Sequence, residues 1–187
     1  TDKVIIATGS VPNTPDMFQY DGKRVITSTE ALEIEKVPKK MVLVGAGVIG
    51  LELGSVFARL GTQVTVVEYL DRALSGMDKD CARELVRSMK KQLGVDFFFN
   101  HQVTAVSATS RSATVTAKNR KSEEEKEWKA DYCLVAIGRI PFTNKLGLEN
   151  IGIETDEKGR IPVDETMKTS VDNIYAIGDV IRGAMLA

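Results

Sequence analysis

The chain has 187 residues, of which 43% are hydrophobic and 27% are charged. These values are ordinary for a folded globular domain and exclude widespread disorder. The 25 Lys and Arg residues balance 26 Asp and Glu residues, so no basic field is available to hold a nucleic acid. The longest uncharged apolar stretch, residues 41–51, is far shorter than the ~20 residues that span a membrane. We therefore expect neither nucleic acid nor membrane as a partner, and no residue spacing indicates a metal site.

The first hundred residues alternate short apolar runs with helical patterns, each closed by turn or capping residues. In chain order they predict a buried parallel strand over 3–7, a hydroxyl-capped short helix over 28–32, a strand over 41–44, a helix over 48–60 ended by Gly61, a strand over 64–67, a helix from Asp78 to Leu93 ended by Gly94, and a strand over 95–99. Strands alternating with helices in this way predict parallel βαβ units. The expected fold class is therefore α/β, with a doubly wound, Rossmann-like parallel sheet.

The second half of the chain adds a different pattern. Residues 103–109 and 113–118 alternate polar and apolar side chains, which predicts an antiparallel β meander with one wet face. The highly charged run 118–127 is typical of a solvated hairpin tip. Further strands are expected over 132–137 and 174–177. Both ends of the sequence lie in apolar stretches without a cap, which predicts a piece of a larger protein.

Residues 45–50 match the pattern G-x-G-x-x-G between a predicted strand and a predicted helix. Gly45 permits a tight turn, Gly47 lets a pyrophosphate approach the backbone, and Gly50 lets the helix pack on the strand. Gly54, one turn further along, also suits close packing. The unpaired N–H groups at the helix start would bind the phosphates, aided by the positive end of the helix dipole.

Glu68 ends the next predicted strand, 18 residues after Gly50. Its carboxylate is placed to accept hydrogen bonds from ribose hydroxyls, as in dinucleotide sites. A 2′-phosphate there would meet like charge, at up to about 4 kcal/mol per unit charge for ~4 Å and an effective dielectric near 20. The sequence therefore favours NAD over NADP. The alternative is a glycine-rich turn without a ligand. It would require the preceding strand, the following helix and the acid at the end of the next strand to coincide by chance.

Glu52 is unusual because it lies two residues beyond Gly50 in an otherwise apolar helix. A buried carboxylate needs a partner. Glu52 is therefore either a group near the nicotinamide or paired with a cation from a part outside this sequence, or it is an acid on the helix surface near the positive end of the dipole. The residues alone leave these alternatives open.

Four segments together resemble the dihydrolipoamide dehydrogenase family of class I pyridine nucleotide-disulfide oxidoreductases: GAGVIGLELGSVF at 45–57, Glu68, GRIPFT at 138–143 and IYAIGDV at 174–180. The resemblance covers essentially the whole chain. It implies that Val103 and Gly138 line the adenine and nicotinamide sides, and that Glu52 lies near the nicotinamide. The implied NAD-binding residues are Gly45, Ala46, Gly47, Val48, Ile49, Gly50, Leu51, Glu52, Glu68, Val103 and Gly138.

The resemblance also implies an NAD domain at 11–140, inserted between two pieces of an FAD domain at 1–10 and 141–187. Asp179 would hydrogen-bond a ribityl hydroxyl of FAD, and residues 185–187 would begin a helix that faces the flavin. The implied FAD-binding residues are Thr8, Gly9, Ser10, Asp179, Met185, Leu186 and Ala187. We expect exposed apolar surface on both FAD-domain pieces.

The chain also departs from the family pattern. The family's redox disulfide needs two cysteines with four residues between them, whereas Cys81 and Cys133 are separated by 51 residues. Both are expected to be small buried hydrophobic residues. His101, the single histidine, is expected to be a surface imidazole at a turn. The disulfide and the His-Glu acid–base pair are thus expected outside this chain, so no catalytic residue is expected within it. Glu52 is a possible group on the nicotinamide or flavin side.

The resemblance implies the NAD-binding portion of a flavoprotein that oxidises protein-bound dihydrolipoamide to lipoamide and reduces NAD+ through FAD and a redox disulfide. The whole protein would be a homodimer serving lipoyl domains of 2-oxoacid dehydrogenase or glycine cleavage complexes, in the mitochondrial matrix or the bacterial cytoplasm. The alternatives are a related disulfide reductase or soluble transhydrogenase, and a free-standing NAD-sensing Rossmann module without catalysis. The 187-residue chain alone is expected to be inactive.

Overall fold

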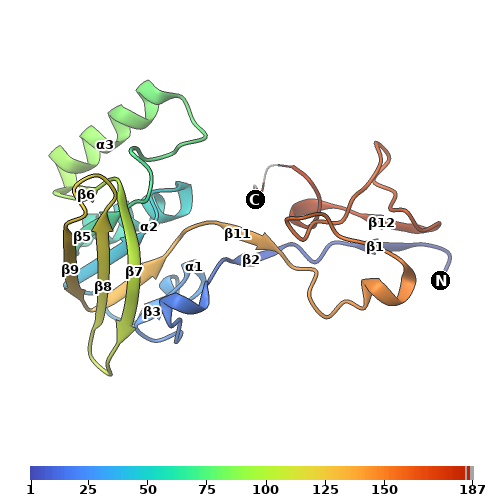
Figure 1. Cartoon of the computed structure of the whole chain (residues 1–187), viewed down its shortest axis with the longest axis horizontal. Helices are drawn as coiled ribbons and strands as arrows, with labels where there is room; N and C mark the ends of the chain where they lie inside the picture. The colour runs from blue at the N-terminus through green and yellow to red at the C-terminus, as the bar shows by residue number, and fades with distance from the viewer. Residues whose placement is uncertain (184, 186–187) are drawn as a thin grey trace. The chain divides into compact units, whose positions relative to one another are not determined.

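The computed structural model describes residues 1–183 and 185, and the chain divides into two compact units (Figure 1). The larger unit is Asn13–Gly138, and the smaller unit combines Thr1–Pro12 with Arg139–Ala187. The sequence places its predicted boundaries after residues 10 and 140. Each unit has its own hydrophobic core, so we describe each by itself.

The larger unit is built on a five-stranded sheet in which every neighbouring pair is parallel. Its strands, in spatial order, are β3 (Val25–Ile26), β10 (Tyr132–Val135), β4 (Lys40–Val44), β5 (Gln63–Val67) and β6 (Asp96–Phe98). The central strands are nearly continuous apolar runs because both of their faces are covered. This confirms the predicted α/β, Rossmann-like fold.

Alternate residues of β4 point into two different cores. Met41 and Leu43 pack with α1 (Ser28–Ala31), α2 (Val48–Arg59) and α3 (Lys79–Leu93). Val42 and Val44 pack against an antiparallel meander on the other face. Side chains of a strand alternate between its faces, so a single strand contributes to both cores. Helices thus cover one face of this sheet, and the meander covers the other.

The helix ends follow from capping chemistry. The Thr27 side chain and Glu30 form a reciprocal capping box at the start of α1. At α3, the Asp78 carboxylate accepts from the N–H groups of Asp80 and Cys81. Gly94 ends α3 in the left-handed conformation at φ +65°, which glycine adopts without penalty. These observations confirm the predicted bounds of α3.

The meander has three strands rather than the predicted two: β7 (His101–Ala108), β8 (Ala113–Asn119) and β9 (Glu125–Ala130). The run 118–127 is therefore not a hairpin tip throughout, because its two ends belong to β8 and β9. Most of β9 faces solvent, so most of its residues are charged and the sequence lacks the apolar residues that would indicate a strand. Its Trp128 packs against the inner core of the meander.

The smaller unit contains two short strand pairs. β1 (Val4–Ile6) is parallel to β12 (Ile174–Ala176), and β2 (Ser10–Pro12) is antiparallel to β11 (Arg139–Pro141). The parallel pairing of β1 confirms the prediction, but its predicted burial is wrong, since Ile5 is 62% exposed. Phe142 and Ile177 are exposed as well, as expected for these segments. The buried residues of this unit are Leu148, Ile153, Ile161, Ala176 and Val180.

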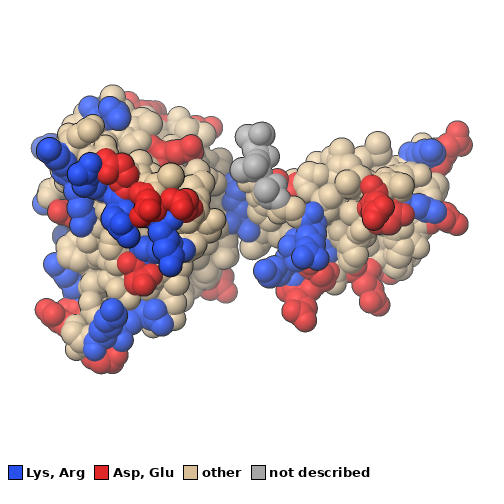
Figure 2. Space-filling model, turned by 90° about the horizontal axis from the view of Figure 1, so that it is seen from above, with Lys and Arg blue, Asp and Glu red and all other residues tan. Residues whose placement is uncertain are grey.

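Three further short 3-10 helices complete the described chain: η1 (Asp16–Phe18) in the larger unit, and η2 (Leu148–Ile151) and η3 (Gly178–Val180) in the smaller unit. None of the helices in the described residues is long and apolar enough to cross a membrane. On the face in view in Figure 2, basic and acidic side chains are interspersed, in keeping with the balanced charge of the sequence.

Two individual expectations are wrong. Cys81 is exposed rather than buried, because it lies on the solvent side of the amphipathic helix α3. Cys133 is buried as expected, and desolvation raises the pKa of its thiol to about 12. His101 begins β7 instead of lying in a turn, and its half-buried ring meets Trp128 edge-on, with the ring centroids 6.1 Å apart.

Candidate functional site

The segment Gly45–Gly50, hereafter the glycine loop, connects the carboxyl end of β4 to α2. Gly45 has φ +101°, and a Cβ there would lie 2.6 Å from the backbone oxygen of Ala136. At Gly50, a Cβ would lie 2.9 Å from the oxygen of Gly45. The first glycine thus permits the tight turn and the third permits close packing. The fold itself demands glycine at both positions.

Gly47 differs from these two glycines, because its backbone conformation and surroundings do not require glycine. Its φ of −79° and ψ of 178° suit any residue, and a Cβ there would have only the Ala136 oxygen within 4 Å, at 3.9 Å. Gly47 is also exposed, so its missing side chain leaves the backbone open to solution. The fold therefore does not require this glycine, and its open backbone is compatible with the close approach of a ligand.

The N-terminus of α2 has no side-chain cap, in contrast to α1 and α3. The N–H groups in the first turn of a helix have no intrahelical acceptor. In α2 they lie beside the open backbone of Gly47, and the helix dipole adds partial positive charge. This arrangement fits the oxygens of a phosphate group.

The Glu68 carboxylate lies against the glycine loop. Its Oε2 accepts a hydrogen bond of 2.6 Å from the N–H of Ala46, and its Oε1 accepts one of 2.7 Å from the N–H of Leu70. Each carboxylate oxygen can accept a second hydrogen bond, and the side chain is only half-buried. Glu68 can therefore support the loop and still accept hydrogen bonds from ribose hydroxyls.

Strand register brings these groups to one edge of the sheet. Val44 is paired with Val67 on one side and with Val135 on the other, so the three strands end together. The glycine loop, Glu68 and Gly138 all follow these strand ends. In open α/β sheets, ligands bind outside the carboxyl ends of the strands, where the direction of the connections reverses.

The remaining predicted residues of this unit differ in accessibility. Leu51 is 2% exposed and Val103 is 8% exposed, so both side chains belong mainly to the cores. Val48 is exposed, Ile49 is half-buried, and Gly138 is exposed at φ +120°. Glu52 is exposed on α2, where it matches the alternative of a helix-surface acid. Its place near a nicotinamide stays a prediction.

In the smaller unit, a hydrogen-bonded relay connects Arg139, Ser10 and Asp179. Arg139 Nε donates to Ser10 Oγ at 2.7 Å, and Ser10 Oγ donates to Asp179 Oδ2 at 2.6 Å. Because guanidinium groups only donate, the single hydroxyl proton of Ser10 must go to the carboxylate. The sequence analysis did not single out Arg139 as a site residue, although it lies within the GRIPFT segment.

The other residues predicted for FAD lie outside this group of hydrogen bonds. Thr8 Oγ1 donates to the oxygen of Phe142 at 2.6 Å. Gly9 has φ +70°, which is strained for other residues, although a Cβ there would meet nothing within 4 Å. Met185 is half-buried. Leu186 and Ala187 lie outside the described residues.

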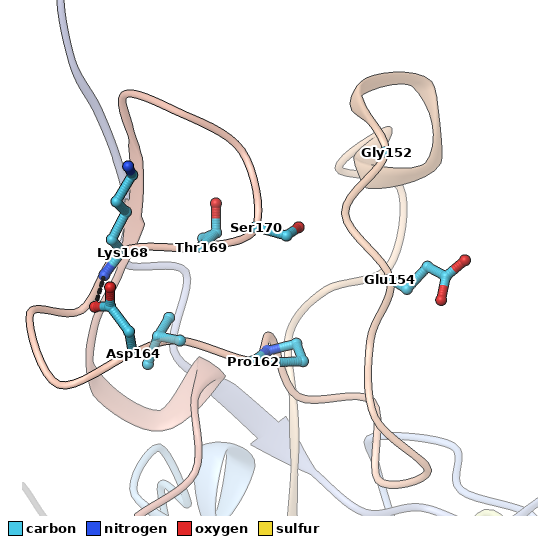
Figure 3. A pocket seen from close by; sticks show the side chains of 8 residues that line it. Gly152, Glu154, Pro162, Asp164, Lys168, Thr169 and Ser170 are labelled. Carbon is cyan, nitrogen blue, oxygen red and sulfur yellow. Dashed lines mark hydrogen bonds between the residues drawn. The ribbon is translucent and has the colours of Figure 1, made fainter.

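The smaller unit also carries an open pocket of about 560 Å³ (Figure 3). Its lining comes from loops and includes none of the predicted binding residues. Two lining residues are joined by a 3.0 Å hydrogen bond from the Lys168 backbone N–H to the Asp164 carboxylate (Figure 3). Within residues 1–183 and 185, no group of His, Cys, Asp and Glu side chains could hold a metal ion. We therefore place the candidate site at the glycine loop.

The chain is similar to known proteins over nearly its whole length. Residues 1–187 match the family described as pyridine nucleotide-disulphide oxidoreductase. The chain is similar to dihydrolipoyl dehydrogenase 3 of Pseudomonas putida, with 45% identity over 98% of this chain and 39% of that protein. It is 44% identical to the mitochondrial dihydrolipoyl dehydrogenase of Caenorhabditis elegans, over 98% of this chain and 37% of that protein.

The fold is also similar to that of solved structures. The HOCl-induced flavoprotein disulfide reductase RclA from Escherichia coli superimposes with a TM-score of 0.87 at 32% identity, over 98% of this chain and 41% of that chain. The chain thus spans well under half the length of these relatives. Similarity in sequence and in structure extends over nearly the whole of this chain. The chain belongs to the pyridine nucleotide-disulphide oxidoreductase family.

Proposed function

We propose that this chain forms the NAD-binding portion of a flavoprotein that oxidises protein-bound dihydrolipoamide to lipoamide. In the whole protein, two electrons would pass from the dithiol through a redox disulfide and FAD to NAD+. The observation that carries the proposal is the Glu68 carboxylate held 2.6 Å from the Ala46 N–H, beside the uncapped start of α2. The substrate class follows from similarity to the two dihydrolipoyl dehydrogenases.

Residues of the larger unit fit two parts of NAD, the diphosphate and the ribose of its adenosine. Open backbone at Gly47 and the unpaired N–H groups of α2 would hold the diphosphate. Glu68 would accept from the adenosine ribose hydroxyls and disfavour a 2′-phosphate by charge repulsion. NAD supplies the hydride acceptor when bound, and this unit supplies its orientation. Val103, Gly138 and Glu52 are proposed neighbours of the adenine and nicotinamide.

The smaller unit would supply part of an FAD site. Ser10 fixes one oxygen of Asp179, and the structure gives the other oxygen no partner among the described residues. That oxygen would remain available to a flavin ribityl hydroxyl, which fits the expectation from the sequence. The flavoprotein nature of RclA supports this assignment. The division into an NAD domain and two FAD-domain pieces belongs to the same proposal.

The whole protein would act as a homodimer on lipoyl domains of 2-oxoacid dehydrogenase or glycine cleavage complexes, in mitochondria or bacterial cytoplasm. A related flavoprotein disulfide reductase is the second candidate, and it is favoured by the 0.87 TM-score with RclA. Assay of the whole protein with dihydrolipoamide and NAD+ distinguishes the two. Turnover supports the first candidate, whereas activity with another disulfide substrate alone supports the second.

Titration of the 187-residue chain with NADH, followed by fluorescence, tests the binding proposal. We expect saturable binding of NADH and weaker binding of NADPH. The Glu68→Gln variant preserves size but removes the charge, so NADH affinity should fall and the preference over NADPH should shrink. Absence of saturable NADH binding, or a Glu68→Gln variant with unchanged selectivity, would refute the proposed site.

A further inference from the structure

The turn between β8 and β9 is an ordered structure rather than a loose charged loop. The Asn119 side-chain oxygen accepts from the N–H groups of Lys121 and Ser122 at 2.9 and 3.1 Å. The N–H of Glu123 donates to the Asn119 backbone oxygen at 2.9 Å, and the Glu123 side chain forms a salt bridge with Lys118. This turn therefore presents Arg120 in a defined position.

Arg120 contacts the segment that directly follows Glu68. The guanidinium carbon of Arg120 lies 3.9 Å from the centroid of the Tyr69 ring, and Nη1 donates to the Tyr69 backbone oxygen at 3.4 Å. The backbone N–H of Arg120 donates to the Asn100 oxygen at 2.7 Å. Within the part of the chain that the structure describes, Arg120 forms no salt bridge. Tyr69 is thus the principal partner of its side chain.

These contacts continue to the glycine loop through backbone hydrogen bonds. The N–H of Asn100 donates to the Leu70 oxygen at 2.8 Å, and the N–H of Leu70 donates to Glu68 Oε1 at 2.7 Å. Glu68 Oε2 then accepts from the Ala46 N–H. Since Asn100 also accepts from Arg120, the turn and the Glu68 carboxylate restrain the same two residues, Tyr69 and Leu70.

We propose that Arg120 is a positioning residue of the nucleotide site, which holds Tyr69 and Leu70 so that the Glu68 carboxylate faces both Ala46 and the adenosine ribose. The proposal rests on the proposed function, because it assumes that Glu68 binds the ribose. Arg120 acts through Glu68 and needs no contact with the nucleotide. Loss of Arg120 should therefore affect NADH, which uses Glu68, more than NADPH, which Glu68 repels.

Nucleotide titration of the Arg120→Ala variant tests this proposal. An exposed cation–π contact is typically worth ~0.5–1 kcal/mol, so NADH affinity should fall about two- to fivefold. NADPH affinity should change little, and the selectivity for NADH should fall accordingly. Arg120→Lys should restore most of the affinity, since it retains the cation. Arg111→Ala, which removes an exposed arginine from the β7–β8 turn, is the matched control and should bind NADH normally.

A double-mutant cycle separates this inference from a general loss of stability. In the Glu68→Gln background, Arg120→Ala should have no further effect on NADH affinity, because the group through which it acts is already impaired. Tyr69→Leu removes the stacking partner and should reproduce the Arg120→Ala result. Additive effects in the cycle would overturn the proposal, as would an unchanged NADH affinity in Arg120→Ala.

The remaining outcomes are also distinguishable. If Arg120→Ala weakens NADPH more than NADH, Arg120 contacts the 2′-phosphate directly and the positioning role is wrong. If the unmodified chain binds no NADH, the proposed function fails together with this inference. If Glu68→Gln behaves as proposed while Arg120→Ala has no effect, only the role of Arg120 fails.

Discussion

Replacing Gly47 by alanine should separate nucleotide binding from folding. A Cβ at this position would lie 3.9 Å from the Ala136 oxygen, which is ordinary van der Waals contact. Alanine is a poorer N-cap than glycine by ~0.5–1.5 kcal/mol, but it reduces the freedom of the unfolded chain by ~0.4–1 kcal/mol. The free energy of unfolding should therefore change by no more than about 1 kcal/mol.

The same methyl group would occupy the position through which the diphosphate approaches the backbone. If it displaces one charge-assisted hydrogen bond, worth ~1.5–3 kcal/mol, NADH affinity should fall about ten- to a hundredfold. Fluorescence titration with NADH measures the affinity, and urea unfolding followed by circular dichroism measures the stability. Normal NADH binding by Gly47→Ala would refute the assignment of this loop to the diphosphate.

Gly45→Ala is the matched control, because it changes the same residue type two positions away. Its φ of +101° is strained for alanine by ~1–3 kcal/mol. In addition, its Cβ would lie 2.6 Å from the Ala136 backbone oxygen, so the end of β10 would have to move. We expect a loss of at least about 2 kcal/mol in stability. A Gly45→Ala variant as stable as the unmodified chain would contradict the steric argument.

Three further predictions concern stability and reactivity. Gly54→Ala would place a Cβ 2.7 Å from a buried leucine methyl group of β4, so overpacking of ~1–3 kcal/mol should exceed the ~1 kcal/mol gain in helix propensity; a variant more stable to urea would contradict this. Alkylation followed by mass spectrometry should label Cys81 alone in the native protein and both thiols in urea, because Cys133 is buried with its pKa raised to about 12; native labelling of Cys133 would refute this. The Asp156 carboxyl pKa is lowered from 3.8 to about 2, chiefly by a hydrogen bond from the Arg160 side chain. The ionised Asp156 carboxylate should therefore stabilise the folded state fully above pH 3.8, and this contribution should disappear as the pH falls through about 2. Asp156→Asn should remove that part of the acid dependence of unfolding, and an identical pH profile would show that the carboxylate does not contribute.

Local sequence patterns were sufficient to predict the main helices and strands of the larger unit. The apolar run of β4, the Asp78 cap and the left-handed Gly94 each depend on residues within one element or its ends. Short-range sterics and capping hydrogen bonds therefore reveal them without knowledge of the fold. The glycine loop could also be predicted, because its pattern depends on the strand before it and the helix after it.

Elements that depend on distant partners were not predictable in the same way. β9 is mostly charged and exposed, and it becomes a strand because β8 offers a complete set of backbone partners. Similarly, Cys81 has the same residue type as Cys133, but the orientation of α3 exposes one thiol while the sheet buries the other. Burial is a property of the packed chain, and residue type alone does not specify it.

For the candidate site, the chemical groups could be identified from the residues alone: glycines where a backbone must be approached and an acid at the end of the next strand. How those groups are held depends on the folded chain. It placed Glu68 on the Ala46 N–H, joined Ser10 to Arg139 and Asp179, and brought Arg120 to Tyr69. Each of these contacts joins residues far apart in the chain, and only the pairing of whole strands sets their distance.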